Sequence, residues 1–204
     1  MAAPRDIVDA LECVLSVYFS GVRHNLRAAF ILCDGLVELT CKVKAEAGGW
    51  RPFQINFVPL LKLGPVSLDP ASSGLGRKCE DTHKVRNKMH HVNAVATVDA
   101  QYCADSILDA VDCIEHCFPG AKAAFEDKIK VALRVVRVYS VQGSGAQRTA
   151  FQDSMSRYKW RARKNPPRVN EIVVSPGLRP HWGMVIMDTV ADIETILNRI
   201  GAPQ

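Results

Sequence analysis

The sequence predicts a mainly α-helical protein, a bundle of four to five helices with a small β-hairpin and a further helix packed on it at the C-terminus. Two observations predict the bundle. Apolar residues recur at three- and four-residue intervals through most of residues 7–139, and glycine or proline interrupts this rhythm where helices should end. A third observation, a change of composition after Val141, divides the chain into a bundle, residues 1–141, and an extension, residues 142–204.

The first two helices are expected at Ile7–Ser20 and Asn25–Ala47. Pro4 suits the start of the first helix, and Gly48 with Gly49 is a strong stop for the second. Because a short turn joins the two helices, we expect them to be antiparallel neighbours.

The next segment, residues 48–76, breaks the rhythm with four prolines and predicts a long irregular connection, whose apolar stretch NFVPLLKL should pack back over the bundle. Helices are then expected at Ser73–His91, Ala100–Phe118 and Ala121–Tyr139. In the last of these, five valines between residues 131 and 141 favour a strand locally, which competes with the helical spacing.

The C-terminal extension reads as a helix, a hairpin and a final helix. The helix is expected at Ala146–Arg161, the strands at Glu171–Ser175 and Trp182–Met187, and the last helix from Thr189 to Ile200.

Composition narrows the class of protein. The net charge of +5 suits an anionic partner without identifying one. The chain contains no Gly-rich phosphate loop, no GxSxG and no HExxH, which disfavours several common enzyme classes. Acidic residues near the N-terminus and the lack of a long uncharged apolar run predict a cytoplasmic protein without a membrane span.

Seven cysteines without a CxxC pair are typical of buried, reduced thiols. Cys113 and Cys117 are four residues apart and would share a helix face, so they could form half of a metal site. No second pair with ligand spacing accompanies them, and we therefore expect neither a metal nor another cofactor.

The stretch VRNKMHHVN gathers Arg86, Asn87, His90 and His91 on one predicted helix. Asn87 and His91 share a helix face, as do Arg86 and His90, whereas Arg86 and His91 are separated by about 140° around the axis. Histidine can take or give a proton near neutral pH, and arginine can hold a phosphate and stabilise its transition-state charge. The stretch is therefore either a site for phosphodiester cleavage or an ordinary solvated helix face.

The pattern and its setting resemble the HEPN family (higher eukaryotes and prokaryotes nucleotide-binding). Arg86, Asn87 and His91 match the family's R-N-x-x-x-H signature, and the two preceding helices and the following amphipathic helix match its domain over roughly residues 5–140. The resemblance implies a metal-independent endoribonuclease, whose active site forms where two copies meet in a homodimer. It also implies a role as a toxin or antiviral-defence effector, with an antitoxin or defence-system protein as a possible partner.

Carried onto this chain, the resemblance makes His91 the general acid or base, Arg86 the phosphate-binding residue and Asn87 the orienting residue. The products would be a 2′,3′-cyclic phosphate and a 5′-hydroxyl. Where toxins of the family that are paired with a nucleotidyltransferase carry a tyrosine, this chain has Asn93, so we do not expect silencing by that route.

Other residues could support this site. His90 is a candidate through its spacing from Arg86, and Asp34 and Glu38 on the second helix could reach across to Arg86, as orienting carboxylates or as plain ion pairs. Glu38 is the preferred carboxylate because apolar residues flank it on both sides. The stretch RYKWRARK offers either an RNA-binding strip or a basic helix end with its tryptophan in the core; the strip would comprise Arg157, Lys159, Trp160, Arg161, Arg163 and Lys164.

Three hypotheses follow. The first is an active HEPN-like ribonuclease that works on RNA as a homodimer. The second is a HEPN-like module without cleavage activity that binds RNA, a nucleotide or a protein. The third is a helical adaptor in which the polar cluster is accidental.

Overall fold

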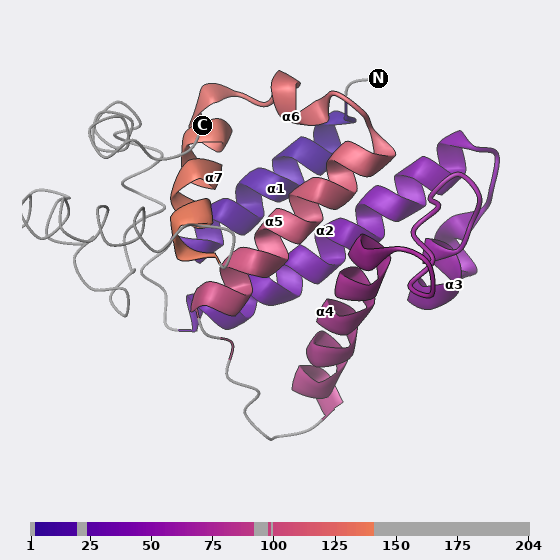
Figure 1. Ribbon diagram of the computed structural model, residues 1–204, viewed down its shortest axis with the longest axis horizontal. Helices are drawn as coiled ribbons and strands as arrows, with labels where there is room; N and C mark the ends of the chain where they lie inside the picture. Colours follow the sequence, from indigo (N-terminus) through magenta and orange to yellow (C-terminus); the bar gives the residue numbers. More distant parts are fainter. Residues whose placement is uncertain (1–2, 20–23, 92–97, 99, 141–204) are drawn as a thin grey trace, which may run out of the picture.

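The computed structural model describes residues 3–19, 24–91, 98 and 100–140. Every regular element in these residues is a helix, and Figure 1 shows the helices gathered into a bundle. The prediction of a mainly α-helical protein is therefore confirmed. The helix, hairpin and final helix expected after residue 142 lie outside the described residues.

The bundle begins with a pair of antiparallel helices, α1 (Arg5–Tyr18) and α2 (Asn25–Ala47), which lie side by side in Figure 1. In α1 the residues at helical spacing are buried, from Ile7 through Leu11 to Tyr18. Helix α2 is the central element and also contacts the helices that follow. Both helices lie where the sequence predicts them, although α1 begins two residues earlier than the spacing indicates.

The connection after α2 is more regular than expected. It contains a short 3₁₀ helix, η1 (Pro52–Gln54), and one turn of α-helix, α3 (Phe57–Leu61). Its apolar side chains pack onto the bundle as predicted, and the buried ones are Phe57, Leu60, Leu61, Val66 and Leu68. This packing fixes the connection against the helix that carries the RNKMHH stretch.

That helix, α4 (Gly74–His91), starts at a hydroxyl cap, because Oγ of Ser73 accepts a hydrogen bond of 3.0 Å from the backbone N–H of Gly76. Gly76 also permits a close approach between α4 and the connection. A Cβ at this position would lie 2.0 Å from the carbonyl oxygen of Leu68, which leaves no room for a side chain. Helix α4 slants away from the other long helices at the lower right of Figure 1.

Helix α5 (Ala100–Cys117) lies against α2, and α7 (Asp127–Tyr139) packs on α5 and α1. The prediction of one helix over residues 121–139 is wrong, because α6 (Ala121–Ala124) ends before α7 starts. Phe125 and Glu126 between them have extended backbones, which allows the Phe125 ring to be buried. The helical spacing prevails over the strand preference of the valines, because Ile129, Ala132 and Val136 bury one face of α7.

The buried apolar residues form one continuous core in which α2 and α5 contribute to the centre. In the part of the chain that the structure describes, none of the helices combines the length and apolar character needed to cross a lipid bilayer.

Candidate functional site

Arg86 and Asn87 lie in the second half of α4, and the guanidinium of Arg86 faces α2. Its Nε lies 2.9 Å from Oδ2 of Asp34, and its Nη1 donates a hydrogen bond of 3.0 Å to Oδ1 of Asn87. The Nε–H does not point at the carboxylate, so it has no hydrogen-bond partner among the described residues and the contact is an ion pair. The side chain of Arg86 is 28% exposed, and that of Asp34 is 1% exposed.

A second side chain of α4, that of His83, meets the same carboxylate. Nδ1 of His83 lies 3.1 Å from both oxygens of Asp34, and the imidazole stacks on the ring of Phe57 with centroids 4.2 Å apart and planes at 15°. Helix α3 thus fixes the plane of the ring, and α2 fixes its hydrogen bond. Sequence reasoning missed His83. Its position three residues before Arg86, on the same helix face, was the pattern that could have indicated it.

Asp34 sits between these two side chains in a position that disfavours its charge. Burial raises the pKa of Asp34, while the charges of His83 and Arg86 and the hydrogen bond to His83 act in the opposite direction. The charge of Glu38, one helical turn away, raises this pKa further. A carboxylate so placed depends on both partners of α4 to stay ionised.

The preference for Glu38 as the carboxylate that contacts Arg86 is wrong. Glu38 pairs with Lys42, one turn further along α2, at 2.6 Å between Oε1 and Nζ. Asp34 and Glu38 lie on the same side of α2, one turn apart, but Asp34 is the one level with Arg86, whereas Glu38 has a partner on its own helix. Apolar neighbours in the sequence did not distinguish the two positions.

The end of α4 is tied to the start of α2. Nη2 of Arg27 donates a hydrogen bond of 2.9 Å to the carbonyl oxygen of Met89, whose own side chain is buried. Because α4 is helical through His91, positions 87 and 91 lie on one side of it. The side chains of His90 and His91 lie outside the described residues, as does the whole basic stretch from Arg157 to Lys164.

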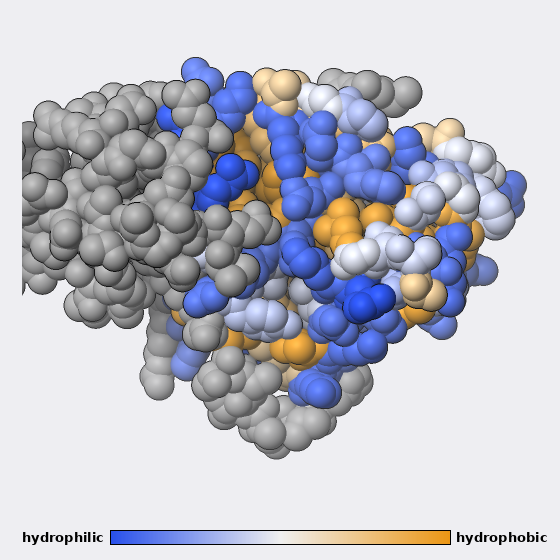
Figure 2. Space-filling model, in the orientation of Figure 1, coloured by the Kyte–Doolittle hydropathy of each residue, from blue (hydrophilic) through white to orange (hydrophobic). Residues whose placement is uncertain are grey.

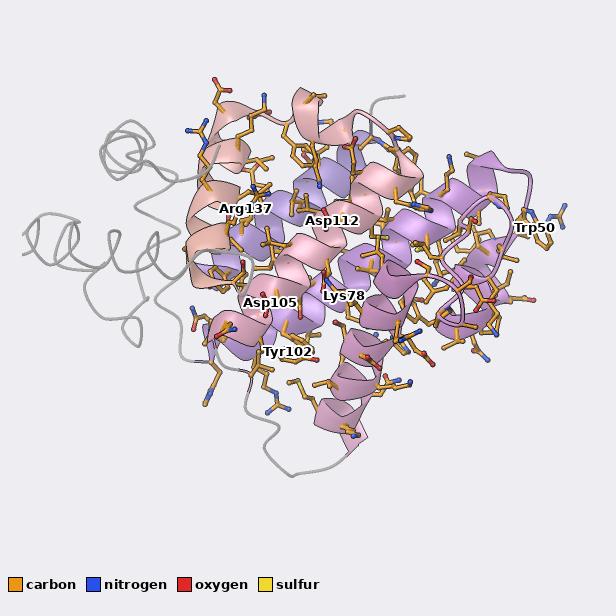
Figure 3. All side chains as sticks on the ribbon, viewed as in Figure 1. Trp50, Lys78, Tyr102, Asp105, Asp112 and Arg137 are labelled. Atoms are coloured by element: carbon orange, nitrogen blue, oxygen red, sulfur yellow. The ribbon has the colours of Figure 1, made fainter. Side chains whose placement is uncertain are left out.

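The edge of α5 next to α4 is acidic. Nζ of Lys78 lies 2.8 Å from Oδ1 of Asp109, and this hydrogen bond, together with the charges of Asp112 and Asp105, raises the pKa of Lys78. Figure 3 shows Lys78 of α4 beside α5. Asp105 lies nearer the lower end of α5 in this view, and Asp112 nearer the upper end. This face is mostly hydrophilic in Figure 2. A row of carboxylates repels phosphates, so α5 adds nothing to anion binding at Arg86.

A separate cavity of about 390 Å³ lies between α5, α6 and α7, and Figure 3 labels two residues of its lining, Asp112 and Arg137. One wall is apolar, with Val111, Phe125 and Leu133, and the rest of the lining is largely basic. It contains none of the residues that the sequence predicts for the site.

Comparison of the chain with protein-family models, with curated proteins and with solved structures gave no match. Inference about function therefore rests on the residues of α2, α3 and α4 themselves.

Proposed function

We propose that this protein is a metal-independent, HEPN-like endoribonuclease that cleaves single-stranded RNA and acts as a homodimer. The observation that supports this proposal best is the setting of Arg86, which is paired with a buried carboxylate on one side and with Asn87 on the other. An arginine on a merely solvated helix face needs no such partner.

Arg86 is suited to holding a phosphate because its rotamer is restricted. The ion pair with Asp34 fixes the Nε side of the guanidinium, and the hydrogen bond from Nη1 to Asn87 fixes its plane. The part of the side chain that stays exposed can then meet a phosphate oxygen without a further loss of rotamer entropy. His83 and Asp34 are positioning residues in this arrangement, since they act on RNA only through Arg86.

The proposed reaction is an internal transfer of the phosphodiester. His91 removes the proton from a ribose 2′-hydroxyl, and the 2′-oxygen attacks the adjacent phosphorus. The bond from phosphorus to the 5′-oxygen of the next nucleotide breaks, and a protonated histidine gives that oxygen its proton. The products are a 2′,3′-cyclic phosphate and a 5′-hydroxyl, while Arg86 stabilises the charge that builds on the phosphate oxygens.

The homodimer belongs to the proposal because one α4 helix carries one R-N-x-x-x-H set. Two such sets that meet across a two-fold axis supply a base and an acid at the same time. Each set would also add one arginine to a single cleft, which strengthens the binding of a phosphate.

The test is cleavage of a mixed-sequence single-stranded RNA by purified protein in EDTA, with analysis of the product ends. Wild type is compared with His91→Ala and Arg86→Ala, and with Arg77→Ala as a matched control, because Arg77 is an exposed arginine on the same helix. We expect cyclic phosphate ends from wild type and from the control, and at least a hundredfold slower cleavage by the two motif variants.

Other outcomes separate the competing hypotheses. RNA that binds to wild type but is never cut, with binding weakened by Arg86→Ala alone, identifies a binding module without ribonuclease activity. Equal cleavage by wild type and His91→Ala means that the active site lies elsewhere or that a contaminating ribonuclease is present. A toxin or defence effector would in addition arrest growth on expression, and His91→Ala would relieve that arrest.

A further inference from the structure

Three cysteines that are far apart in the sequence come together in the core. The Sγ atoms of Cys41 on α2 and of Cys113 and Cys117 on α5 all lie within 4.8 Å of one another, and each residue is at most 1% exposed. The spacing of four residues predicted a shared helix face for Cys113 and Cys117, but it could not show that α2 brings a third thiol to that face.

The distances fit a metal-thiolate centre. Sγ of Cys41 lies 3.8 Å from Sγ of Cys113. In a tetrahedral zinc site with bonds of about 2.3 Å to sulfur, two sulfur atoms are separated by about 3.8 Å. The pair is therefore already spaced as two ligands of one zinc ion are.

A fourth thiol adjoins the group. Cys79 of α4 is buried. The contacts of Arg27 with Met89 and of Asp34 with Arg86 show that α2 and α4 run antiparallel, so Cys79 lies at the level of Cys41. Its Sγ is not within 4.8 Å of all three other thiols and would have to move toward them to complete a site. Structural zinc sites are closed and take four protein ligands, and four cysteines are a common set.

Zinc binds thiolates and not thiols. Binding of the ion to this cluster would therefore release the protons of the cysteines, and zinc affinity should fall at low pH.

Other buried cysteines of the bundle behave differently. Cys33 donates to the carbonyl oxygen of Ser106 at 3.0 Å, and Cys103 donates to that of Leu26 at 3.5 Å. Each of these thiols is thus satisfied by the backbone, as a small core residue would be. They provide matched controls for the cluster.

We propose that Cys41, Cys113 and Cys117, with Cys79 as the fourth ligand, bind one structural zinc ion that ties α2, α4 and α5 together. Cys79 precedes Arg86 by two turns of α4, and Cys41 follows Asp34 by two turns of α2, so the zinc site would lie about 10 Å along both helices from the Asp34–Arg86 ion pair. The zinc ion takes no part in RNA cleavage. Its binding to the cysteines is therefore independent of whether the protein is a ribonuclease. Its role is to fix the crossing of α2 and α4.

The first test is the zinc content of wild-type protein purified without chelators, measured by plasma mass spectrometry. We expect about one zinc per chain, as for a closed structural site. Cys33→Ala and Cys103→Ala should keep the zinc, whereas Cys117→Ala should lose it. Circular dichroism of each variant accompanies the metal analysis and separates loss of zinc from loss of folding.

The second test uses wild type alone and so does not depend on the folding of a variant. Apo protein titrated with cobalt(II) should develop the strong sulfur-to-cobalt charge-transfer bands and the visible bands of a tetrahedral thiolate site, saturating at about one ion per chain. Cys79→Ala should weaken cobalt binding at least tenfold and shift these bands. An unchanged spectrum would remove Cys79 from the ligand set.

Two results would overturn the proposal. One is folded wild type without zinc and without cobalt–thiolate bands. The other is a disulfide between Cys41 and Cys113 in protein purified under reducing conditions, because oxidised sulfur cannot serve as a thiolate ligand.

Discussion

Asp34 of α2 lies 2.9 Å from Arg86 of α4 and is almost completely buried, while the arginine stays partly exposed. The two partners therefore differ in what they lose when the other is removed. A buried carboxylate is stabilised as an anion only by its charged or hydrogen-bonding partners, whereas a guanidinium at the surface can be solvated by water instead.

This asymmetry predicts that Arg86→Ala costs more stability than Asp34→Asn at neutral pH. We expect a loss of about 3 kcal/mol in the free energy of unfolding for Arg86→Ala, because it leaves a buried charge with His83 alone. We expect about 1 kcal/mol for Asp34→Asn, which leaves the partly solvated guanidinium of Arg86 without its carboxylate. Urea unfolding of both variants at pH 7 measures the difference.

The control is the double variant Asp34→Asn with Arg86→Ala, in which neither charge is present. It should be more stable than Arg86→Ala alone, since the unpaired carboxylate is gone. Equal stability of the single Arg86→Ala variant and wild type would show that the ion pair contributes nothing to the fold.

A dependence on pH follows from the raised pKa of Asp34. A carboxyl group whose pKa is higher in the folded than in the unfolded state stabilises the fold at pH values below its ordinary pKa. This stabilisation is lost as the pH rises through the pKa of the folded state. Arg86→Ala removes one influence that lowers this pKa, so its loss of stability relative to wild type should be small near pH 4 and grow toward pH 7.

Urea midpoints measured across this range test the prediction. The double variant with Asp34→Asn serves as the reference, because it has no carboxyl group to titrate at position 34. A difference between Arg86→Ala and wild type that is constant with pH would mean that Asp34 is not the group responsible.

A close backbone contact predicts the effect of a methyl group at Gly76. Gly76→Ala should destabilise the protein by about 3 kcal/mol or more, because the Cβ would overlap the backbone of Leu68 and push the connection away from α4. Gly74→Ala is the matched control. Gly74 is on the same helix, and a Cβ added there would meet open space, so Gly74→Ala should be neutral or stabilising by up to about 1 kcal/mol. Thermal unfolding of both variants makes the comparison, and equal melting temperatures would rule out the close approach.

The contact of His83 with Asp34 makes a prediction about activity. If Arg86 binds the phosphate, His83→Ala should lower kcat/KM for RNA cleavage about tenfold, because the carboxylate that positions Arg86 loses a partner. His83→Gln keeps a hydrogen-bond donor and should restore most of the activity. In an Arg86→Ala background, His83→Ala should cause no further loss of kcat/KM. A further loss in that background would contradict a role through Arg86.

The local parts of the fold could be predicted from the sequence. Helices α1, α2, α4 and α5 lie within two residues of the ranges that apolar spacing and the glycine and proline stops indicate. The break between α6 and α7 could not be predicted from the sequence, because it depends on the burial of Phe125 against the bundle. For the candidate site, the sequence indicated Arg86 and Asn87 and named Asp34 as one of two carboxylates, but it preferred Glu38.

What the sequence by itself determined is which segments are helical and which face of each is apolar, since helical hydrogen bonds and side-chain spacing depend on neighbours within four positions. Only the tertiary structure decided that Asp34 meets Arg86 and His83, and that Cys41 joins Cys113 and Cys117. These contacts depend on how α2 crosses α4 and α5. That crossing is set by the packing of the whole core, which no local pattern specifies.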